Sequence, residues 1–288
     1  MDIGVGLPAT IPQVEAGQIL DWARAADQQG FASLGIIDRL VYGNQEPLVT
    51  LAAVAGVTER VRLVTSILLA PLRTNAALLA KQAATIDHLS GGRLVLGMAV
   101  GGRQDDYQAS GLELSDRGQR FDALLEELRR IWSGEPRGFA GAIGPTPPPG
   151  RPTVVIGGNS PQSFERVARW GDGWIAGGGP PAWFAQGAAQ ARSAWSRHGR
   201  DGEPRLAALA YAALGPDARD HADRYLRDYY AFLGPAAEQI AAGALTDPQA
   251  LRDTVAQFEQ AGCDELILFP CNPDPGQVGL LADAVGLR

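Results

Sequence analysis

The stretch that decides the fold is residues 61–103, VRLVTSILLAPLRTNAALLAKQAATIDHLSGGRLVLGMAVGGR. Its first ten residues, VRLVTSILLA, are rich in β-branched side chains and leucine, which is typical of a buried strand. A helix is predicted from about Thr74, the expected N-cap, to Ser90, and two glycines end it. RLVLGMAV is the next predicted strand. Because a helix joins the two strands, they should be parallel, with their C-terminal ends on the face where ligands bind.

The same alternation of strand and helix runs through the rest of the chain. Further apolar strands are predicted at residues 3–7, 31–37, 153–158, 173–176, 205–213 and 265–269. Further helices are predicted at residues 13–29, 47–58, 117–132, 161–170, 181–198 and 247–260, and the tail at 275–287 should close the ring. Eight strands in this length favour one α/β domain over residues 1–288. We expect a (β/α)8 TIM barrel rather than a doubly wound sheet.

Three segments are longer than a barrel requires and are predicted insertions. The first is a polar loop at about 103–116, and the second, at 134–152, is a Gly- and Pro-rich loop that contains three prolines at 147–149. The third, at 216–245, should hold a helix over 216–233. Tyr225, Tyr229 and Phe232 would then share one helical face. That face either packs on the barrel or covers a flat, apolar substrate.

The composition is that of a globular protein. Of 288 residues, 45% are hydrophobic and 20% charged, which is enough for a large core. The net charge of −7 argues against nucleic acid or an anionic membrane as partner. Cys263 and Cys271 fit neither a disulfide framework nor a zinc motif, so we expect free thiols in a reducing cytoplasm. Neither a signal peptide nor a membrane-spanning stretch is expected.

A barrel places the residues that follow each strand at its mouth. The predicted mouth residues are Asp38, Arg39, Ser66, Ile67, Val100, Gly101, Gly102, Arg103, Gly157, Gly158, Asn159, Ser160, Gly177, Gly178 and Gly179. Glycines let backbone amides approach a bound group closely, and residues 157–160 open a helix whose N-terminus suits a phosphate. From the residues alone, ordinary turn chemistry is the simpler explanation of these glycines.

The histidines do not indicate a hydrolase. His88 and His198 precede strands and should face away from the mouth, while nothing local marks His221 in the third insertion. The sequence has no serine in a nucleophile elbow and no paired His–carboxylate motif. No metal site is therefore predicted.

Several motifs resemble the bacterial luciferase-like family, which comprises flavin-dependent monooxygenases and coenzyme F420-dependent oxidoreductases. They are TSI at 65–67, LRTN at 72–75, AKQAATID at 80–87, LSGGRL at 89–94, IGG at 156–158 and GDGW at 171–174. AKQAATID followed by LSGGRL is the most specific of them. The resemblance covers most of residues 1–180 and implies the same barrel.

The resemblance also implies a cofactor site. It favours a cofactor phosphate at the glycine turns 157–160 and 177–179. It places a strand bulge with a non-proline cis peptide at Ser66-Ile67, behind the flavin ring, and puts Asp38 near the cofactor. Where F420 dehydrogenases of the family often carry a catalytic His, this chain has Arg39, and Gly102 falls near the place of a Glu. Both departures argue against the sugar-phosphate dehydrogenases of the family.

Arg120 resembles an arginine that reaches the FMN phosphate in luciferases, although a solvated helix residue is nearly as good an interpretation. We assign Arg39 as the catalytic residue, acting as a charge or hydrogen-bond donor rather than a proton shuttle. The predicted substrate residues are Tyr42, Arg103, Tyr229 and Tyr230.

The sequence thus predicts an oxidoreductase, most simply a two-component monooxygenase. It would receive reduced FMN from a separate flavin reductase and use O2 on a small organic substrate. The alternative is F420-dependent hydride transfer, and a more distant one is a flavin-binding protein without turnover. The Ala- and Leu-rich helical sequences at 47–57 and 75–86 also predict a homodimer, as in the family.

Overall fold

The structure, a computed structural model, describes residues 1–146 and 150–287. Its strands are β1 (Asp2–Gly6), β2 (Ser33–Ile36), β3 (Arg62–Thr65), β4 (Leu68–Leu69), β5 (Leu94–Ala99), β6 (Thr153–Gly157), β7 (Gly173–Ile175), β8 (Arg205–Ala212) and β9 (Glu265–Pro270). They pair in the order β3-β2-β1-β9-β8-β7-β6-β5-β4, and β3 also pairs with β5. Every pairing is parallel, so the sheet closes into the predicted TIM barrel of eight strand positions, with β3 and β4 sharing one.

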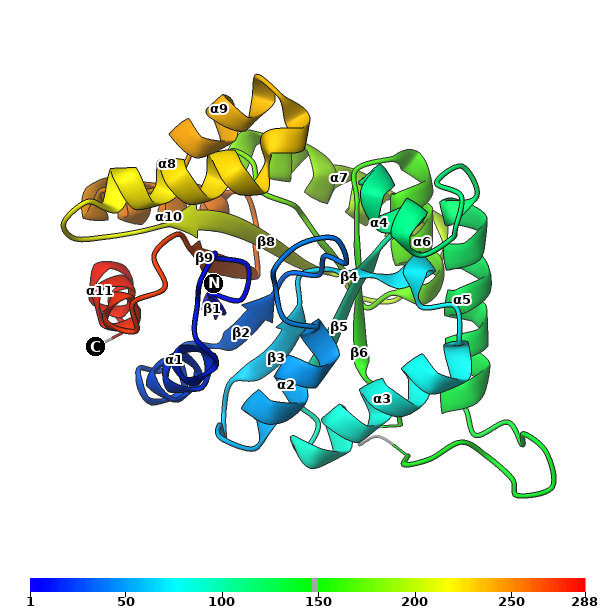
Figure 1. The fold of residues 1–288 in the computed structure, drawn as a ribbon. Coiled ribbons are helices and arrows are strands. Elements are labelled where there is room, and N and C mark those ends of the chain that lie inside the picture. Colours follow the sequence, from blue (N-terminus) through cyan, green and yellow to red (C-terminus); the bar gives the residue numbers. More distant parts are fainter. Residues whose placement is uncertain (147–149, 288) are drawn as a thin grey trace.

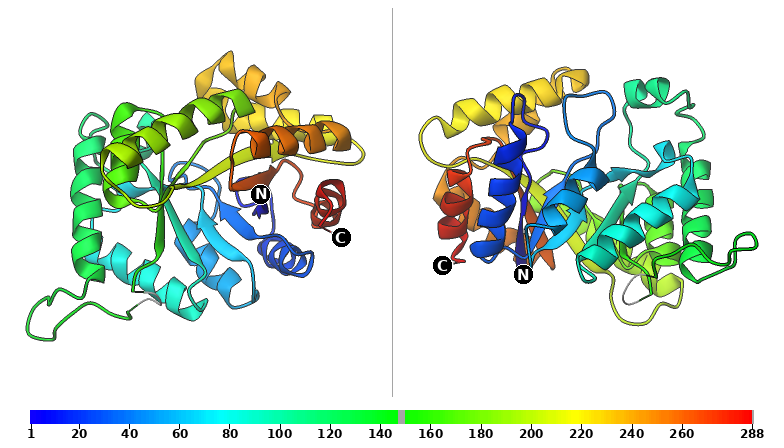
Figure 2. Two further views of the ribbon diagram at one scale, coloured as in Figure 1. Left: turned by 180° about the vertical axis from the view of Figure 1, so that it is seen from behind. Right: turned by 60° about the horizontal axis from the view of Figure 1, so that its bottom comes forward.

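Helices surround this barrel (Figure 1 and Figure 2). They are α1 (Ala16–Gln28), α2 (Pro47–Ala55), α3 (Ala76–Leu89), α4 (Gln104–Ala109), α5 (Arg117–Trp132), α6 (Pro161–Trp170), α7 (Pro181–Arg197), α8 (Ala218–Tyr229), α9 (Ala236–Ala242), α10 (Pro248–Gln260) and α11 (Gly276–Val285). Two short 3-10 turns, η1 (Ala70–Leu72) and η2 (Ala231–Leu233), complete the described elements.

The strands are apolar on both faces because one face fills the barrel and the other meets the helices. Along β8, Ala207, Leu209 and Tyr211 pack in the interior cluster, whereas Leu206 and Ala208 belong to the outer core. On β9, Phe269 also points inward. A Cβ added at Gly6 would lie 2.3 Å from the Phe269 ring, so that glycine leaves room for the aromatic side chain.

The third strand position differs from the continuous strand predicted at 61–70. β3 ends at Thr65 and β4 begins at Leu68, with a cis peptide bond between Ser66 and Ile67. This is the bulge that the family resemblance implied, and the uniformly apolar sequence did not reveal the break.

Several predicted helix boundaries were wrong. The N-cap of α3 is Asn75, not Thr74, because the Asn75 side chain accepts from the Leu78 amide at 3.0 Å. Residues 104–109 form the short helix α4 instead of a polar loop. The first helix begins at Ala16, so Val14 lies before it. The glycine-rich loop was predicted over 134–152, and its three prolines at 147–149 lie outside the described residues.

The helix predicted at 216–233 is also shorter. Asp217 adopts a left-handed conformation with φ of 56° and α8 starts after it, while η2 follows Tyr229. Tyr225 and Tyr229 are buried, but Phe232 is 54% exposed, so the three side chains do not share one face as predicted. The insertion returns to the barrel at Leu245, which pairs with Ala212 beside β8.

Two features are absent from residues 1–146 and 150–287. No helix there is long and apolar enough to cross a membrane. Within residues 1–146 and 150–287, no group of three or more His, Cys, Asp or Glu side chains is arranged to hold a metal ion.

Candidate active site

Asp38, at the end of β2, holds the chain that follows the cis bond. Its carboxylate accepts from the Leu69 amide at 2.9 Å and from Arg73 at 2.9 Å. Burial raises the pKa of the Asp38 carboxyl, while the charge of Arg73 and the hydrogen bonds oppose that rise. Asp38 therefore fixes the position of β4, and with it the bulge at 66–67.

The bulge faces the end of β6. A Cβ built on Gly157 would lie 3.3 Å from the Ile67 side chain, so the two residues are close neighbours. Ser66 is buried, and its hydroxyl has no hydrogen-bond partner in the described part of the chain. A buried hydroxyl without a partner is costly, and a ligand atom at this place would satisfy it.

The glycine turn after β6 leads into α6. Gly158 has φ of 111°, and its carbonyl accepts from the Trp174 indole at 2.9 Å. Ser160 caps α6 by accepting from the Ser163 amide at 3.2 Å. Asn159 and Ser160 are exposed, so the N-terminal end of this ten-residue helix is accessible.

The second glycine turn follows β7. Gly177, Gly178 and Gly179 are exposed, and a Cβ on Gly177 would meet no atom within 4 Å. A Cβ on Gly179 would lie 3.1 Å from the Trp183 ring, so Gly177 is the most open position of this turn. The exposed backbone at Asn159, Ser160 and Gly177 is accessible to a phosphate. Together with the free Ser66 hydroxyl, these features fit a flavin or a deazaflavin.

The segment after β5 also lies at the mouth. Gly101 has φ of 68°, and a side chain there would lie 2.6 Å from Leu69. Gly102 is exposed with open space around it. The carbonyl of Val100 accepts from the Tyr107 hydroxyl, which ties α4 to the end of β5.

The Arg39 side chain is part of a network of ion pairs and hydrogen bonds. Its Nε donates to Asp106 at 2.8 Å, and its Nη2 donates to Asp105 at 2.9 Å and to the Val41 carbonyl at 2.9 Å. The Arg39 side chain is only 4% exposed and that of Asp106 1%. The network joins the loop after β2 to α4. A direct catalytic role for Arg39 stays a prediction.

Arg103 and the predicted substrate tyrosines meet over the mouth. Both Nη atoms of Arg103 donate to the Tyr229 carbonyl at 3.0 Å. Tyr42 packs edge-on against Tyr229, with ring centroids 5.2 Å apart, and its hydroxyl donates to Asp228 at 2.5 Å. The Tyr230 hydroxyl lies 2.8 Å from that of Tyr211 on β8. The four residues that the sequence assigned to substrate thus lie together.

Arg120 lies in the first turn of α5. Its Nη atoms donate to Asp116 and to the Glu113 carbonyl, while its buried Nε has no partner among the described residues. Arg120 and Arg73 line a cavity of about 410 Å³ between η1 and α5. A contact of Arg120 with the cofactor phosphate stays a prediction.

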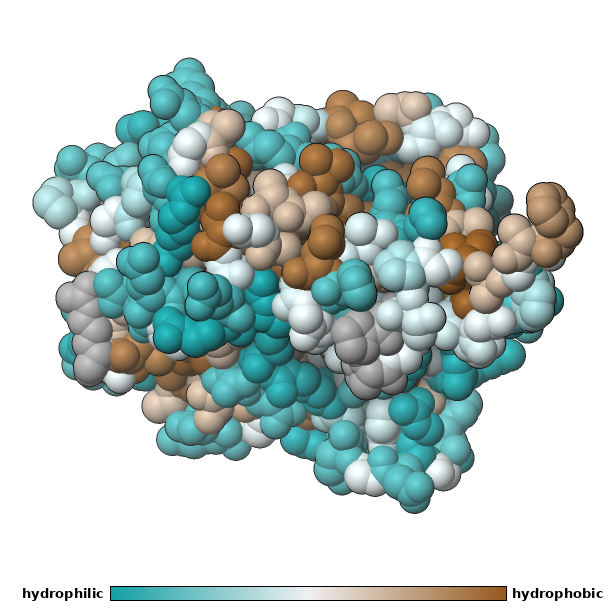
Figure 3. All heavy atoms as spheres, turned by 90° about the horizontal axis from the view of Figure 1, so that it is seen from below, coloured by the Kyte–Doolittle hydropathy of each residue, from teal (hydrophilic) through white to brown (hydrophobic). Residues whose placement is uncertain are grey.

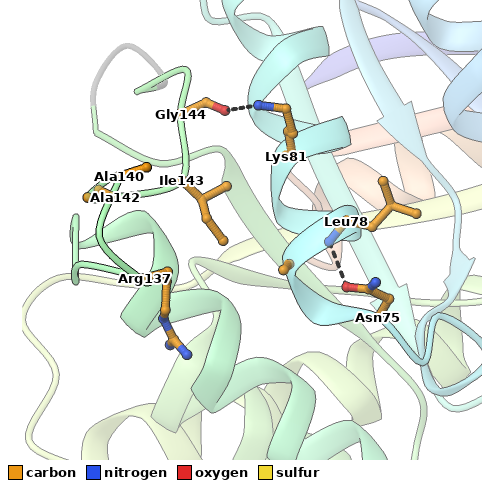
Figure 4. Close-up of a pocket in the computed structure, with 10 residues that line it drawn as sticks. Asn75, Leu78, Lys81, Arg137, Ala140, Ala142, Ile143 and Gly144 are labelled. Atoms are coloured by element: carbon orange, nitrogen blue, oxygen red, sulfur yellow. Dashed lines mark hydrogen bonds between the residues drawn. The ribbon is translucent and has the colours of Figure 1, made fainter.

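A second cavity, of about 400 Å³, lies outside the mouth between α3 and residues 137–144 (Figure 4). Lys81 closes one side by donating to the Gly144 carbonyl at 2.9 Å. The figure shows Leu78 and Lys81 on α3 and Ile143 on the opposite loop. None of the predicted site residues lines it.

The three histidines lie on helices or at a helix end. His88 is exposed in the last turn of α3, and His198 pairs with Glu165 at 2.6 Å after α7. His221 is part of α8, and its backbone amide bonds to Asp217. No described hydrogen bond joins any of the three to a mouth residue.

Sequence reasoning missed three parts of the site. The first is Arg73, which donates to Asp38. Its position in the LRTN motif at 72–75 was the one feature of the sequence that could have indicated a role. Asp105 and Asp106 were read as loop residues, although two adjacent carboxylates after Arg103 could have suggested a cation partner. The contact of Tyr211 with Tyr230 could not be predicted, because an aromatic residue in an apolar strand does not differ from the other core residues in the sequence pattern.

The fold and this mouth define a (β/α)8 barrel protein whose mouth fits a flavin-like cofactor. The family model described as "Luciferase-like monooxygenase" matches residues 1–268, and the chain belongs to that family. An uncharacterised protein of Mycobacterium tuberculosis is 32% identical over an alignment of 188 residues, with a coverage of 55% of this chain and 65% of that protein. The F420-dependent hydroxymycolic acid dehydrogenase of the same organism is 30% identical over an alignment of 189 residues, with a coverage of 60% of this chain and 52% of that one. The chain thus spans less than two thirds of the length of these curated relatives.

Solved structures support the fold. An F420-dependent secondary alcohol dehydrogenase, in complex with an F420–acetone adduct, matches with a TM-score of 0.82 at 18% identity, covering 99% of this chain and 98% of that one. The similar proteins include F420-dependent dehydrogenases and an FMN-binding monooxygenase component.

Proposed function

We propose that this protein is a two-component monooxygenase that takes up reduced FMN, uses O2 and oxygenates a small organic substrate. The observation that supports it most is the bulge at Ser66-Ile67, fixed by Asp38 and facing the Gly157 turn. It offers a flat support with a free buried hydroxyl beside it, and two open glycine turns lie at the same end of the barrel.

When bound, the flavin would supply the redox chemistry, and the residues of the chain would bind, orient and shield it. Ser66 would hydrogen-bond the ring system, and the amides of 157–160 and 177–179 would hold the phosphate. The aromatic residues of α8 and η2 would keep water out.

The mouth has few groups ready to move a proton, and this favours oxygen chemistry over hydride transfer. Asp38 is bonded to Leu69 and Arg73, and Asp106 to Arg39 and two backbone amides. Oxidising an alcohol needs a base for its hydroxyl proton. Among the described residues, neither carboxylate is free for that role.

F420-dependent hydride transfer is the second candidate. It is favoured by the names of two similar proteins, the M. tuberculosis hydroxymycolic acid dehydrogenase and the secondary alcohol dehydrogenase. An FMN-binding oxygenating constituent of 3,6-diketocamphane monooxygenase has a TM-score of 0.74 at 18% identity, so the fold alone accommodates both cofactors.

The proposed phosphate site at the glycine turns can be tested by adding a side chain at a glycine that has no other protein atom close by. Gly177→Val should lower FMN affinity by about tenfold or more, because its isopropyl group would occupy the space over the amides, while the melting temperature stays within about 2 °C. Isothermal titration calorimetry measures this. Gly158→Val is a poorer choice, because the variant would disturb folding itself. Gly158 has φ of 111°, which valine rarely adopts, and a Cβ there would lie 2.5 Å from the Ser163 hydroxyl. Gly17→Val, at an exposed glycine on α1 with open space around it, is the matched control. Unchanged FMN affinity in folded Gly177→Val would remove this turn from the site.

We also propose a homodimer through α2 and α3. Val49 on α2 and Leu78 on α3 are 68% and 53% exposed, and hydrophobic patches occur on the face shown in Figure 3. Burying such side chains against a second copy would stabilise both chains. Light scattering should give about twice the chain mass of 30.4 kDa, and a monomer at micromolar concentration would contradict this.

A further inference from the structure

Arg103 is a cation at the mouth that has no carboxylate partner among the described residues. It follows β5 and reaches across to α8 and η2, where both Nη atoms share one acceptor, the Tyr229 carbonyl. A guanidinium has five N–H donors, so one carbonyl oxygen leaves most of its capacity unused. Within the described ranges, no carboxylate lies at ion-pair distance from Arg103.

The neighbouring charges do not neutralise it. Asp106 is near enough to influence Arg103 through space, but its oxygens already accept from Arg39 and from the Leu40 and Val41 amides. Asp105 is paired with Arg39 as well. The two carboxylates thus serve Arg39, whose own charge adds to the unfavourable environment of Arg103.

The rest of the surroundings is aromatic. The Arg103 guanidinium carbon lies 3.8 Å from the centre of the Phe232 ring, 4.5 Å from that of Tyr229 and 5.7 Å from that of Tyr230. Burial raises the pKa of both tyrosines, so they stay neutral at physiological pH and supply no negative charge. Burial also lowers the pKa of the arginine, which nevertheless remains protonated.

Packing alone does not explain this arrangement. Cation–π contacts are worth about 0.5–2 kcal/mol, whereas a half-buried guanidinium without an anion loses part of its hydration. Arg39 shows what the protein does when it needs a structural arginine at this mouth: it provides two carboxylates. The unpaired guanidinium, beside apolar ring faces, is instead suited to a ligand with an anionic group and an apolar body.

We propose that Arg103 binds an anionic group of the substrate, a carboxylate in the simplest case, while Tyr229 and Tyr230 contact its apolar body. Arg103 is then a specificity-determining residue, and the substrate is an organic acid. This inference rests on the proposed function for the identity of the mouth as the substrate site. The planar fork of arginine matches a carboxylate through two parallel hydrogen bonds.

The test compares acids with their uncharged amides on the full-length protein without cofactor. Calorimetric titration with benzoate and benzamide, and with decanoate and decanamide, covers aromatic and aliphatic bodies. At least one acid should bind about 10- to 100-fold more tightly than its amide, and the preference should weaken as salt is added. Arg103→Gln should abolish the preference, and Arg103→Lys should retain part of it. Arg224→Gln, an exposed arginine on α8, is the matched control and should behave as the wild type.

Three results would overturn the inference. They are equal binding of acid and amide, a preference that survives in Arg103→Gln, and no binding of either acid up to about 10 mM. A parallel FMN titration separates the cofactor from the substrate. If Arg103→Gln loses FMN affinity and neither acid is preferred, Arg103 serves a cofactor phosphate instead. If the acid preference depends on Arg103 but no flavin or F420 binds, the proposed function fails and the anion site stands.

Discussion

Arg39→Ala should lower the free energy of unfolding by about 3–5 kcal/mol, the largest effect we expect from a mouth residue. The substitution leaves the Asp106 carboxylate, 1% exposed, without its cation, and releases α4 from the loop after β2. Urea denaturation followed by circular dichroism measures the loss. The free energy of unfolding of Arg39→Lys should lie between those of the wild type and Arg39→Ala. Lysine keeps the charge but lacks the planar guanidinium that reaches Asp105 and Asp106 together.

Two variants give this prediction its controls. Arg24→Ala removes an exposed pair with Asp21, of similar length at 2.9 Å, and should cost no more than about 1 kcal/mol. Asp106→Asn combined with Arg39→Ala should cost less than the sum of the single changes, since no buried charge is left unpaired. If Arg39→Ala costs no more than Arg24→Ala, the network does not stabilise the mouth. A normally stable Arg39→Lys with reduced turnover would support the predicted direct role of Arg39.

Replacing Tyr229 and Tyr230 together by Ala should expose the cofactor to water while leaving flavin affinity nearly intact. Tyr229 is 5% exposed, and Tyr230 is held by the Tyr211 hydroxyl, so both rings are part of the cover formed by α8 and η2. After the reduced-FMN complex is mixed with O2, hydrogen peroxide should be released severalfold faster than from the wild type. With substrate present, the product yield should fall.

Tyr230→Phe is the matched control, because it removes only the hydroxyl contact with Tyr211 and keeps the ring. It should release peroxide at nearly the wild-type rate. Hydrogen exchange of residues 216–245 should slow when cofactor binds, as expected for a segment that closes. Unchanged exchange and a fully coupled double variant would mean that this segment only packs on the barrel, and the substrate pocket would then be formed by the loops after β2 and β5.

The barrel could be predicted because its strands are apolar on both faces and alternate regularly with helices. The contacts within the site could not be predicted from the sequence. The break between Thr65 and Leu68 lies within the apolar stretch VRLVTSILLA, so the hydrophobic pattern of the sequence does not mark it. Helix α4 has no apolar period, and its contacts come from Arg39, more than 60 residues away in the chain.

The insertion at 216–245 also shows that the sequence pattern predicts a helix but not its contacts. Tyr225 and Tyr229 follow helical spacing and are buried together, as the period predicts. Phe232 is displaced because the chain changes to a 3-10 turn after Tyr229, where Gly234 and Pro235 prevent a longer helix. Its partner, the Arg103 guanidinium, lies on another insertion, so no local pattern could have paired them.

The most direct test of the central claim is an equilibrium titration of the purified protein with FMN, reduced FMN and F420, the second under anaerobic conditions. We predict that reduced FMN binds most tightly, with a dissociation constant of about 1 μM or below, and F420 at least about tenfold more weakly. Tight binding of F420 with no binding of either FMN form would replace the monooxygenase by the hydride-transfer enzyme. Binding of none of the three would contradict the account of the bulge and the glycine turns as a cofactor site.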